Sequence, residues 1–190
     1  MEEPGYRRQM SEHDMAVAER TIRRAGLLSL AILAVTAPLA WLALPVLTDF
    51  PRHLDERLAF SAQASLPVLL CLVTAVAMVS TGRRFSPDDI GGSAAGPPGP
   101  RIAVQSAFLQ NTLEQTVLAV GAYFAYAATL GGPALSLIPV AVVLFVTGRV
   151  LFYRGYRRGV TGRAFGMILT LMPTLLLYLI IIIAVVARMF

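Results

Sequence analysis

The chain has 190 residues, of which 56% are hydrophobic and only 14% are charged, and its mean hydropathy is +0.68. Soluble globular domains are usually about 45–50% apolar, so this composition excludes a soluble domain and indicates an integral membrane protein. The formal net charge is +5. A surface for RNA or DNA would interleave basic and aromatic residues on a soluble domain. Because the composition leaves room for no such domain, nucleic acid is not expected as a partner.

The first 25 residues predict a charged cytoplasmic tail. Residues 1–10 are expected to be poorly ordered, whereas Ser11 can cap a short interfacial helix with Glu12 and Asp14 in its first turn. The apolar run that follows, residues 26–48, is longer than the roughly 7–15 residues of a signal-peptide core. It therefore predicts an uncleaved transmembrane anchor. Four alanines at three-residue spacing offer it a stripe for close helix packing, namely Ala31, Ala34, Ala37 and Ala40.

Five apolar segments are long enough, or nearly so, to cross a hydrocarbon core of about 30 Å at roughly 1.5 Å per residue. They are residues 26–48, 65–81, 102–130, 134–152 and 164–187. The third is longer than a bilayer needs, so its first turns are expected to project from the membrane. The Gly- and Pro-rich residues 86–100 before it predict a loop. The expected fold class is an all-α integral membrane protein with five spans.

All 16 basic residues are arginines, and their distribution around the expected spans predicts the orientation. Thirteen lie in the N-terminal tail, in the loop before the third span and in the segment before the fifth, whereas three, Arg52, Arg57 and Arg188, lie on the opposite side. Short cytoplasmic loops carry an excess of arginine and lysine. This predicts a cytoplasmic N-terminus and an outer C-terminus, and the expected location is the bacterial inner membrane with lipids as neighbours.

The residues that could bind a metal or form a disulfide are few. The chain has a single cysteine, Cys71, which lies within the second span and is predicted to be a packing residue. The two histidines, His13 and His53, fall on opposite sides of the membrane in the predicted topology. We therefore expect neither a disulfide within the chain nor a metal site.

The third span carries amides and a carboxylate within an apolar segment. Asn111, Glu114 and Gln115 are separated by three and four residues, so they occupy one helical face. Amides often link membrane helices through hydrogen bonds, but a carboxylate within a membrane is costly unless it has a partner. Glu114 is therefore expected to pair across a helix or subunit boundary with an arginine of the cytosolic half. The candidates are Arg83, Arg149 and Arg163.

A second cluster follows the fourth span. Arg149, Phe152, Tyr153 and Tyr156 recur at helical spacing and share one face. An arginine that extends to the interface beside an aromatic belt would account for Tyr153. It would not account for five arginines, three glycines and two tyrosines within fifteen residues, 149–163. This crowding favours a binding site.

The order of these features resembles the MAPEG superfamily, the membrane-associated proteins of eicosanoid and glutathione metabolism. The matching features are the pair Arg83-Arg84 at the end of an apolar helix, a Gly/Pro-rich loop, a helix that opens with Asn111-Thr-Leu-Glu114, and a helix that ends in Gly155-Tyr156 and is followed by Arg163. The resemblance covers about residue 66 to the C-terminus. It implies a four-helix bundle, residues 65–190, that assembles as a homotrimer with glutathione between subunits at the cytosolic side. Residues 26–48 would then be an extra helix, expected to lie outside the bundle without lining the cleft.

The resemblance also implies roles for individual residues. Asn111 and Glu114 match the pair that receives the polar backbone and amino group of glutathione, and Arg83 matches an arginine that reaches the tripeptide. Tyr156 matches a tyrosine that lines the site. Arg163 matches the catalytic arginine that donates to the glutathione sulfur, and a fixed guanidinium favours the thiolate of a thiol whose ordinary pKa is about 8.5. The remaining expected binding residues are Gln115 and Arg149.

The chain departs from the family pattern at three positions. Ala107 stands where the family has an arginine that clamps a glutathione carboxylate. Gln115 stands in place of a tyrosine, and Phe152 occupies the position of an earlier aromatic residue on the fourth helix. Without the arginine, a charge-assisted pair is lost. Three functions therefore stay open: a thiol transferase or peroxidase for lipophilic electrophiles, a non-catalytic lipid-binding or scaffold protein, and a small transporter subunit that uses Glu114.

Overall fold

The computed structural model describes residues 11–190, apart from the side chains of Ala95 and Arg157. The expectation for residues 1–10 lies outside the described part. The helices are α1 (Glu12–Leu47), α2 (Leu54–Arg84), α3 (Ala103–Thr129), α4 (Leu137–Gly155) and α5 (Gly159–Ala187), with short 3-10 helices η1 (Ser93–Ala95), η2 (Gly132–Ser136) and η3 (Tyr156–Arg158). The predicted all-α fold is thus confirmed.

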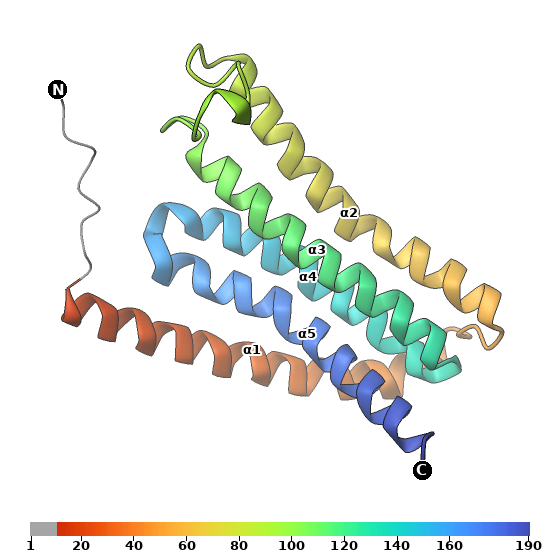
Figure 1. Cartoon of the computed structure of the whole chain (residues 1–190). Coiled ribbons are helices and arrows are strands. Elements are labelled where there is room, and N and C mark those ends of the chain that lie inside the picture. The colour runs from red at the N-terminus through yellow and green to blue at the C-terminus, as the bar shows by residue number, and fades with distance from the viewer. Residues whose placement is uncertain (1–10) are drawn as a thin grey trace.

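The five long helices form a bundle with one helix outside it. Figure 1 shows α2 to α5 running side by side, with α2 along α3, α4 along α5, and α1 along α5 on the outside. One end of the bundle holds the start of α1, the α2–α3 loop and the α4–α5 turn (Figure 1). The opposite end holds the α1–α2 and α3–α4 connections and the C-terminus.

Four helical segments are long and apolar enough to cross a membrane by length and composition: α1, α2, residues 132–155 with α4, and α5. In the part of the chain that the structure describes, α3 does not join them, although its 27 residues are sufficient in length. The amides and the carboxylate in its first half lower its hydropathy below that of the other four segments. These polar residues are Gln105, Gln110, Asn111, Glu114 and Gln115.

The helices extend beyond the predicted apolar spans where charged residues continue a helix past its apolar part. Helix α2 begins at Leu54, before the predicted span 65–81, because Asp55 and Glu56 suit the positive end of the helix dipole although they lower the hydropathy. Ser11 caps α1 as predicted, accepting a hydrogen bond of 3.1 Å from the backbone nitrogen of Asp14. The helix then runs without a break to Leu47, so there is no separate short interfacial helix.

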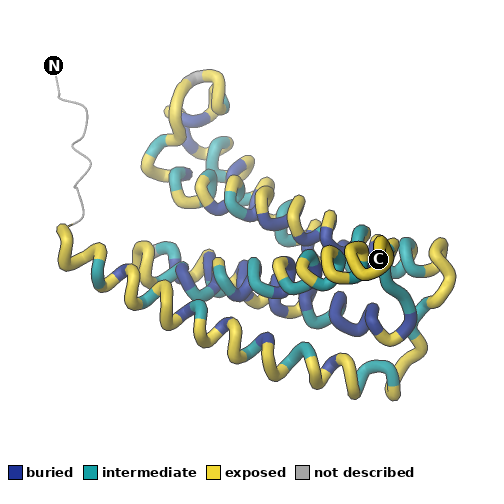
Figure 2. Tube along the Cα trace, turned by 60° about the horizontal axis from the view of Figure 1, so that its bottom comes forward, coloured by how far each residue is buried: buried dark blue, intermediate teal, exposed yellow. Residues whose placement is uncertain are grey.

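Helix α1 lies against the outside of the bundle, as expected, but with a different face. Its buried residues are Ala18, Ala25, Ser29, Leu33 and Ala40. They follow steps of four and seven residues, which keep one face of a helix with 3.6 residues per turn. Strict three-residue spacing drifts around the helix, so Ala31 and Ala34 of the predicted alanine stripe are exposed. Most of α1 is exposed in the single chain (Figure 2).

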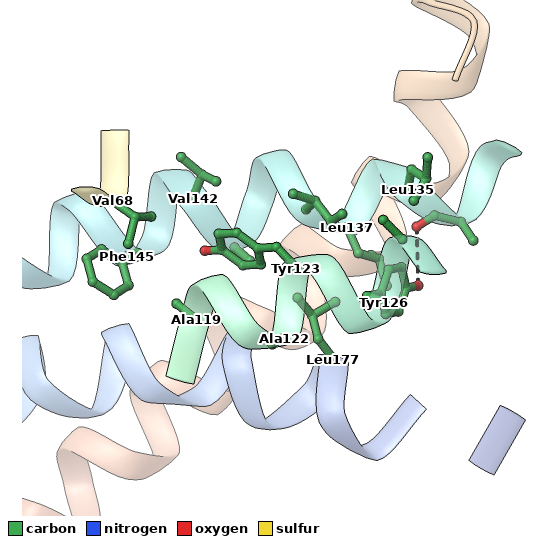
Figure 3. Close-up of a cluster of buried hydrophobic side chains, with 14 residues drawn as sticks. Val68, Ala119, Ala122, Tyr123, Tyr126, Leu135, Leu137, Val142, Phe145 and Leu177 are labelled. Atoms are coloured by element: carbon green, nitrogen blue, oxygen red, sulfur yellow. Dashed lines mark hydrogen bonds between the residues drawn. The ribbon is translucent and has the colours of Figure 1, made fainter. Parts of the chain in front are cut away.

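The core lies where α2 to α5 meet. Val68, Tyr123, Phe145 and Leu177 come one from each of these helices and are almost completely buried (Figure 3). The hydroxyl of Tyr126 donates a hydrogen bond of 3.2 Å to the carbonyl oxygen of Ala134 in η2. This bond ties α3 to the connection that follows it.

Glycines bring α4 and α5 into backbone contact. A Cβ atom added at Gly166 would meet the backbone nitrogen of Phe152, and one added at Gly148 would meet the hydroxyl of Thr170. Near the turn, Gly155 faces the backbone of Gly162 in the same way. Two of the glycines that are crowded in residues 149–163, Gly155 and Gly162, therefore lie where the two helices cross closely, together with Gly148 and Gly166.

Candidate functional site

Arg149 is the centre of the polar interior. It is only 1% exposed, and it connects three helices. Its Nη1 donates a hydrogen bond of 2.7 Å to Oδ1 of Asn111 on α3, and its Nε donates one of 3.1 Å to Oγ1 of Thr170 on α5. The structure thus brings together two of the predicted binding residues, Asn111 and Arg149. It also adds Thr170, which nothing in the sequence had singled out.

The guanidinium of Arg149 has no anionic partner among the described residues. Its central carbon lies 4.7 Å from the centroid of the Phe152 ring and 5.9 Å from that of Phe145, a cation–π arrangement that partly compensates for the loss of water. Its Nη2 atom is buried and has no hydrogen-bond partner within residues 11–190. A buried charge held only by neutral groups is energetically expensive.

Glu114 points away from this interior. It is exposed, and its Oε1 accepts a hydrogen bond of 2.9 Å from Nε2 of Gln110. A helix turns about 100° per residue, so Asn111 and Gln115 face inward together while Glu114 falls to the side of that face. The expected pairing with an arginine is not seen within the described chain. A pair across a subunit boundary stays a prediction.

Arg163 and Tyr156 lie together at the α4–α5 turn. The central carbon of the Arg163 guanidinium lies 4.5 Å from the centroid of the Tyr156 ring, and that ring packs edge-on against Phe152, with 5.4 Å between the centroids. Because Phe152 also contacts Arg149, the predicted residues form one continuous row. It runs through Asn111, Arg149, Phe152, Tyr156 and Arg163.

Arg83 is separate from this row. It lies at the end of α2, and its Nη2 donates a hydrogen bond of 2.7 Å to Oγ of Ser93 in the α2–α3 loop. Within one chain, Arg83 contacts the loop and forms no hydrogen bond with Asn111 or Arg149. Its predicted role in ligand binding is untested. The buried Gln115 forms no hydrogen bond with these residues either, and its predicted role is also untested.

The α2–α3 loop is organised by Asp89, which was not among the predicted site residues. Asp89 accepts hydrogen bonds from the Ser86 hydroxyl (2.6 Å) and from the Gly99 backbone nitrogen (2.7 Å). The bond from Ser86 and then the bond from Gly99 lower the pKa of Asp89 below its ordinary value, with smaller contributions from the charges of Arg83 and Arg101. The three-residue spacing from Ser86 to Asp89 is typical of local side-chain turns. This spacing could have predicted the turn from the sequence.

A mostly apolar groove lies between α2 and α4 beside Arg149. Its volume is about 240 Å³. Its walls comprise Cys71, Thr74 and Met78 of α2, Phe108 of α3, and Arg149, Val150, Tyr153 and Arg154 of α4. Cys71 packs against the core as predicted, but it also borders this groove. Within residues 11–190 there is no group of three or more His, Cys, Asp or Glu side chains that could hold a metal ion.

Residues 60–183 match the family model described as the MAPEG family. The chain belongs to the MAPEG family. The match begins within α2 and ends within α5, so the resemblance drawn from the Asn-x-x-Glu and Gly-Tyr motifs is confirmed, and α1 lies outside the matched residues. Searches of the curated proteins and of the solved structures return no significant match.

Proposed function

We propose that this MAPEG protein is a membrane transferase that conjugates a thiol, glutathione or a relative of it, to lipophilic electrophiles. The observation that carries the proposal is the position of Arg163. Its guanidinium is stacked on Tyr156 at the end of the row that begins at Asn111, and it forms no hydrogen bond to another described residue. Its N–H groups are therefore available to a ligand, because no other described residue accepts from them. A planar donor fixed in this way favours a thiolate over a thiol.

The reaction itself needs little beyond an activated sulfur. The thiol loses its proton to solvent, the thiolate beside Arg163 attacks the electrophilic carbon, and with a chlorinated nitrobenzene the chloride leaves with the bonding electron pair. Since a free thiol with a pKa of about 8.5 is mostly protonated at neutral pH, stabilising the thiolate raises the reactive fraction. In the reduction of a lipid hydroperoxide, the same thiolate would attack the O–O bond and, with a proton from solvent, release the lipid alcohol. A second molecule of the thiol would then convert the resulting sulfenic acid into a disulfide and water.

The identity of the thiol depends on the missing clamp. Ala107 is exposed on α3 and offers no charge to a glutathione carboxylate. A non-catalytic lipid-binding or scaffold role is therefore the second candidate, and it is favoured by Ala107 together with the apolar groove beside α4. The transporter hypothesis depends on Glu114 alone.

The assembly that we propose is a homotrimer with α3 at the subunit contacts. Helix α3 exposes Leu113 and Val117 together with the Gln110–Glu114 pair. A carboxylate facing lipid is disfavoured, so this face is better suited to a neighbouring subunit. If an arginine of that subunit pairs with Glu114, then Glu114→Ala should destabilise the oligomer by about 3–5 kcal/mol. An unchanged melting temperature would argue against the pair.

We propose an orientation with the N-terminus in the cytoplasm and the C-terminus outside, as the arginine distribution indicates. Two of the three arginines at the opposite end have a structural use. Arg188 donates a hydrogen bond of 2.6 Å to the carbonyl oxygen of Thr129, and Arg57 donates one of 3.4 Å to that of Ala128. Both support the negative end of α3. Their presence on the outer side therefore does not weaken the positive-inside argument.

The deciding experiment compares two arginine variants. Wild-type protein in neutral detergent should show thiolate absorbance in the ultraviolet on adding glutathione, and should conjugate glutathione to a chlorinated nitrobenzene. Arg163→Lys should abolish both, since a lysine cannot reproduce the planar fork. Arg154→Lys, at an exposed position on α4, is the matched control and should retain both. Wild-type protein that shows no turnover with several thiols and electrophiles would reject the transferase in favour of the binding protein.

A further inference from the structure

Thr170 is a buried residue of α5 to which the proposed thiol chemistry gives no role. It is 1% exposed and takes part in two hydrogen bonds. Its hydroxyl donates to the carbonyl oxygen of Gly166 at 2.8 Å, and its Oγ1 accepts from Nε of Arg149 at 3.1 Å. Because a hydroxyl has one proton, which Gly166 receives, only lone pairs are left for Arg149. The direction of both bonds is therefore fixed.

The backbone that holds this hydroxyl lies at the α4–α5 crossing. A Cβ atom added at Gly166 would meet the backbone nitrogen of Phe152, and one added at Gly148 would meet Oγ1 of Thr170. Close-packed interiors leave little room for movement at such contacts. Thr170 therefore presents its acceptor to Arg149 from a fixed position.

The bonds of Arg149 determine which way the amide of Asn111 faces. A guanidinium only donates hydrogen bonds, so the 2.7 Å bond from Nη1 of Arg149 has to end on the amide oxygen Oδ1. The amide nitrogen Nδ2 then lies on the other side of the amide group. Asn111 is partly exposed, and its Nδ2 forms no hydrogen bond to another described residue. Asn111 thus offers two N–H donors on the side away from Arg149.

This orientation of Arg149 depends on both of its bonds. The guanidinium is planar, and it is held at Nε by α5 and at Nη1 by α3. Without the hydroxyl of Thr170, the buried Nε–H group would lose its acceptor, which is unfavourable. The guanidinium would then turn toward another acceptor, and the amide of Asn111 would turn with it.

We propose that Thr170 is a positioning residue, which acts through Arg149 to hold the amide of Asn111 with its N–H groups toward the ligand. The inference rests on the proposed function, because the ligand is the thiol of that reaction. Thr170 follows Arg163 by seven residues, or about 10 Å along α5, and forms no hydrogen bond with it. It therefore supports binding of the thiol, through a carbonyl or carboxylate oxygen that accepts from Asn111, and not activation of the sulfur.

Thr170→Val tests this role, because it removes the hydroxyl and keeps the shape of the side chain. In neutral detergent, with glutathione and a chlorinated nitrobenzene, the variant should raise the KM for glutathione about tenfold and change kcat by no more than about twofold, as expected for lost ground-state binding. Thr170→Ser, which keeps the hydroxyl, should restore the KM. Thr174→Val, the same change at a 2% exposed position one turn later, is the matched control and should keep the wild-type KM.

A double-mutant cycle tests whether Thr170 acts through Asn111. Binding of S-hexylglutathione, a thioether that cannot react, is measured by equilibrium dialysis and therefore needs no turnover. Thr170→Val should weaken binding about tenfold in the wild-type background but no more than about twofold in the Asn111→Ala background, since coupled residues are not additive.

Asn111→Asp tests the amide directly, and it keeps the proposal falsifiable if Thr170→Val does not fold. The new carboxylate can accept from Arg149 in a charge-assisted bond, so the melting temperature should be kept or raised. The ligand-facing N–H donors are lost, so binding of S-hexylglutathione should still weaken about tenfold.

Four results would overturn the positioning role. They are additive losses in the cycle, a lowered kcat with an unchanged KM in Thr170→Val, a Thr174→Val control that behaves like Thr170→Val, and normal binding by Asn111→Asp. Wild-type protein that binds no S-hexylglutathione would overturn it as well. Wild-type protein that binds S-hexylglutathione but turns over no thiol would reject the transferase alone, and the cycle would then decide the role of Thr170.

Discussion

Helices α1 and α4 are both apolar, yet they are buried to very different extents. Each of these segments contains an 18-residue stretch that is apolar enough to cross a membrane. In α1, 17% of that stretch is buried, whereas in residues 132–155, which contain α4, 61% of it is buried. In a membrane, lipid accepts an apolar surface as readily as protein does, so hydropathy does not decide which helix packs inside. The glycines and the buried arginine of α4 do. The α4–α5 crossing therefore holds the fold, whereas α1 is attached to it.

The largest effect is expected at the α4–α5 crossing. Gly166→Ala should destabilise the protein by at least about 3 kcal/mol, the upper end of typical overpacking, because the new Cβ would meet the backbone of Phe152, which cannot rotate away as a side chain can. Unfolding monitored in detergent measures the change. Gly26→Ala in α1 is the control, since a Cβ there meets nothing within 4 Å. It should stabilise α1 by up to about 1 kcal/mol. Equal losses in the two variants would contradict the contrast between the helices.

A smaller loss is expected when the buried arginine loses an acceptor. Asn111→Ala should cost about 1.5–3 kcal/mol, the usual range for a hydrogen bond to a charged group, because Nη1 of Arg149 would then be as unpaired as Nη2. Gln63→Ala, which removes an exposed amide of α2 that forms no hydrogen bond to another described residue, should change the free energy of unfolding by no more than about 0.5 kcal/mol. If both variants behave alike, the bond between Asn111 and Arg149 contributes little to holding α3 against α4.

The sequence could predict those features of the fold and of the site that a local pattern of residues encodes, and it could not predict the others. Apolar runs indicated that the helices exist, but not that α2 starts at Leu54 or α5 at Gly159, because charged and glycine residues at helix ends lower the hydropathy without stopping the helix. The Asn-x-x-Glu and Gly-Tyr motifs predicted the family, which the family model confirms. The contact between Asn111 and Arg149 joins residues 38 positions apart, and it depends on the crossing geometry of the helices, which no local pattern encodes.

A still smaller effect is expected when α1 is removed. Deleting residues 1–48 should leave the oligomer intact, because α1 lies along the outside of α4 and α5 and contributes nothing to the groove or to the row from Asn111 to Arg163. Light scattering of the truncated protein in detergent should give the same number of subunits as for the full chain. A monomeric product would mean that α1 takes part in assembly, and the distinction between a structural crossing and an attached helix would fail.

The smallest effect is local and depends on pH. The α2–α3 loop is held by polar bonds to Asp89 instead of by packing, and these bonds lower the pKa of its carboxyl in the folded state. A lowered folded pKa means that the stabilisation is fully present above the ordinary aspartate value of about 3.9 and is lost as the pH falls through the lower, folded value. Hydrogen exchange of residues 86–100 should therefore show protection that is constant near neutral pH and decreases in strong acid.

Asp89→Asn should remove this pH dependence, whereas Asp88→Asn, its exposed neighbour, should preserve it. Because no helix crossing involves Asp89, global unfolding should stay unchanged in both variants. If Asp89→Asn instead lowers the global melting temperature as Gly166→Ala does, then the loop is coupled to the bundle, and polar bonds at its end stabilise the fold together with the glycine crossing.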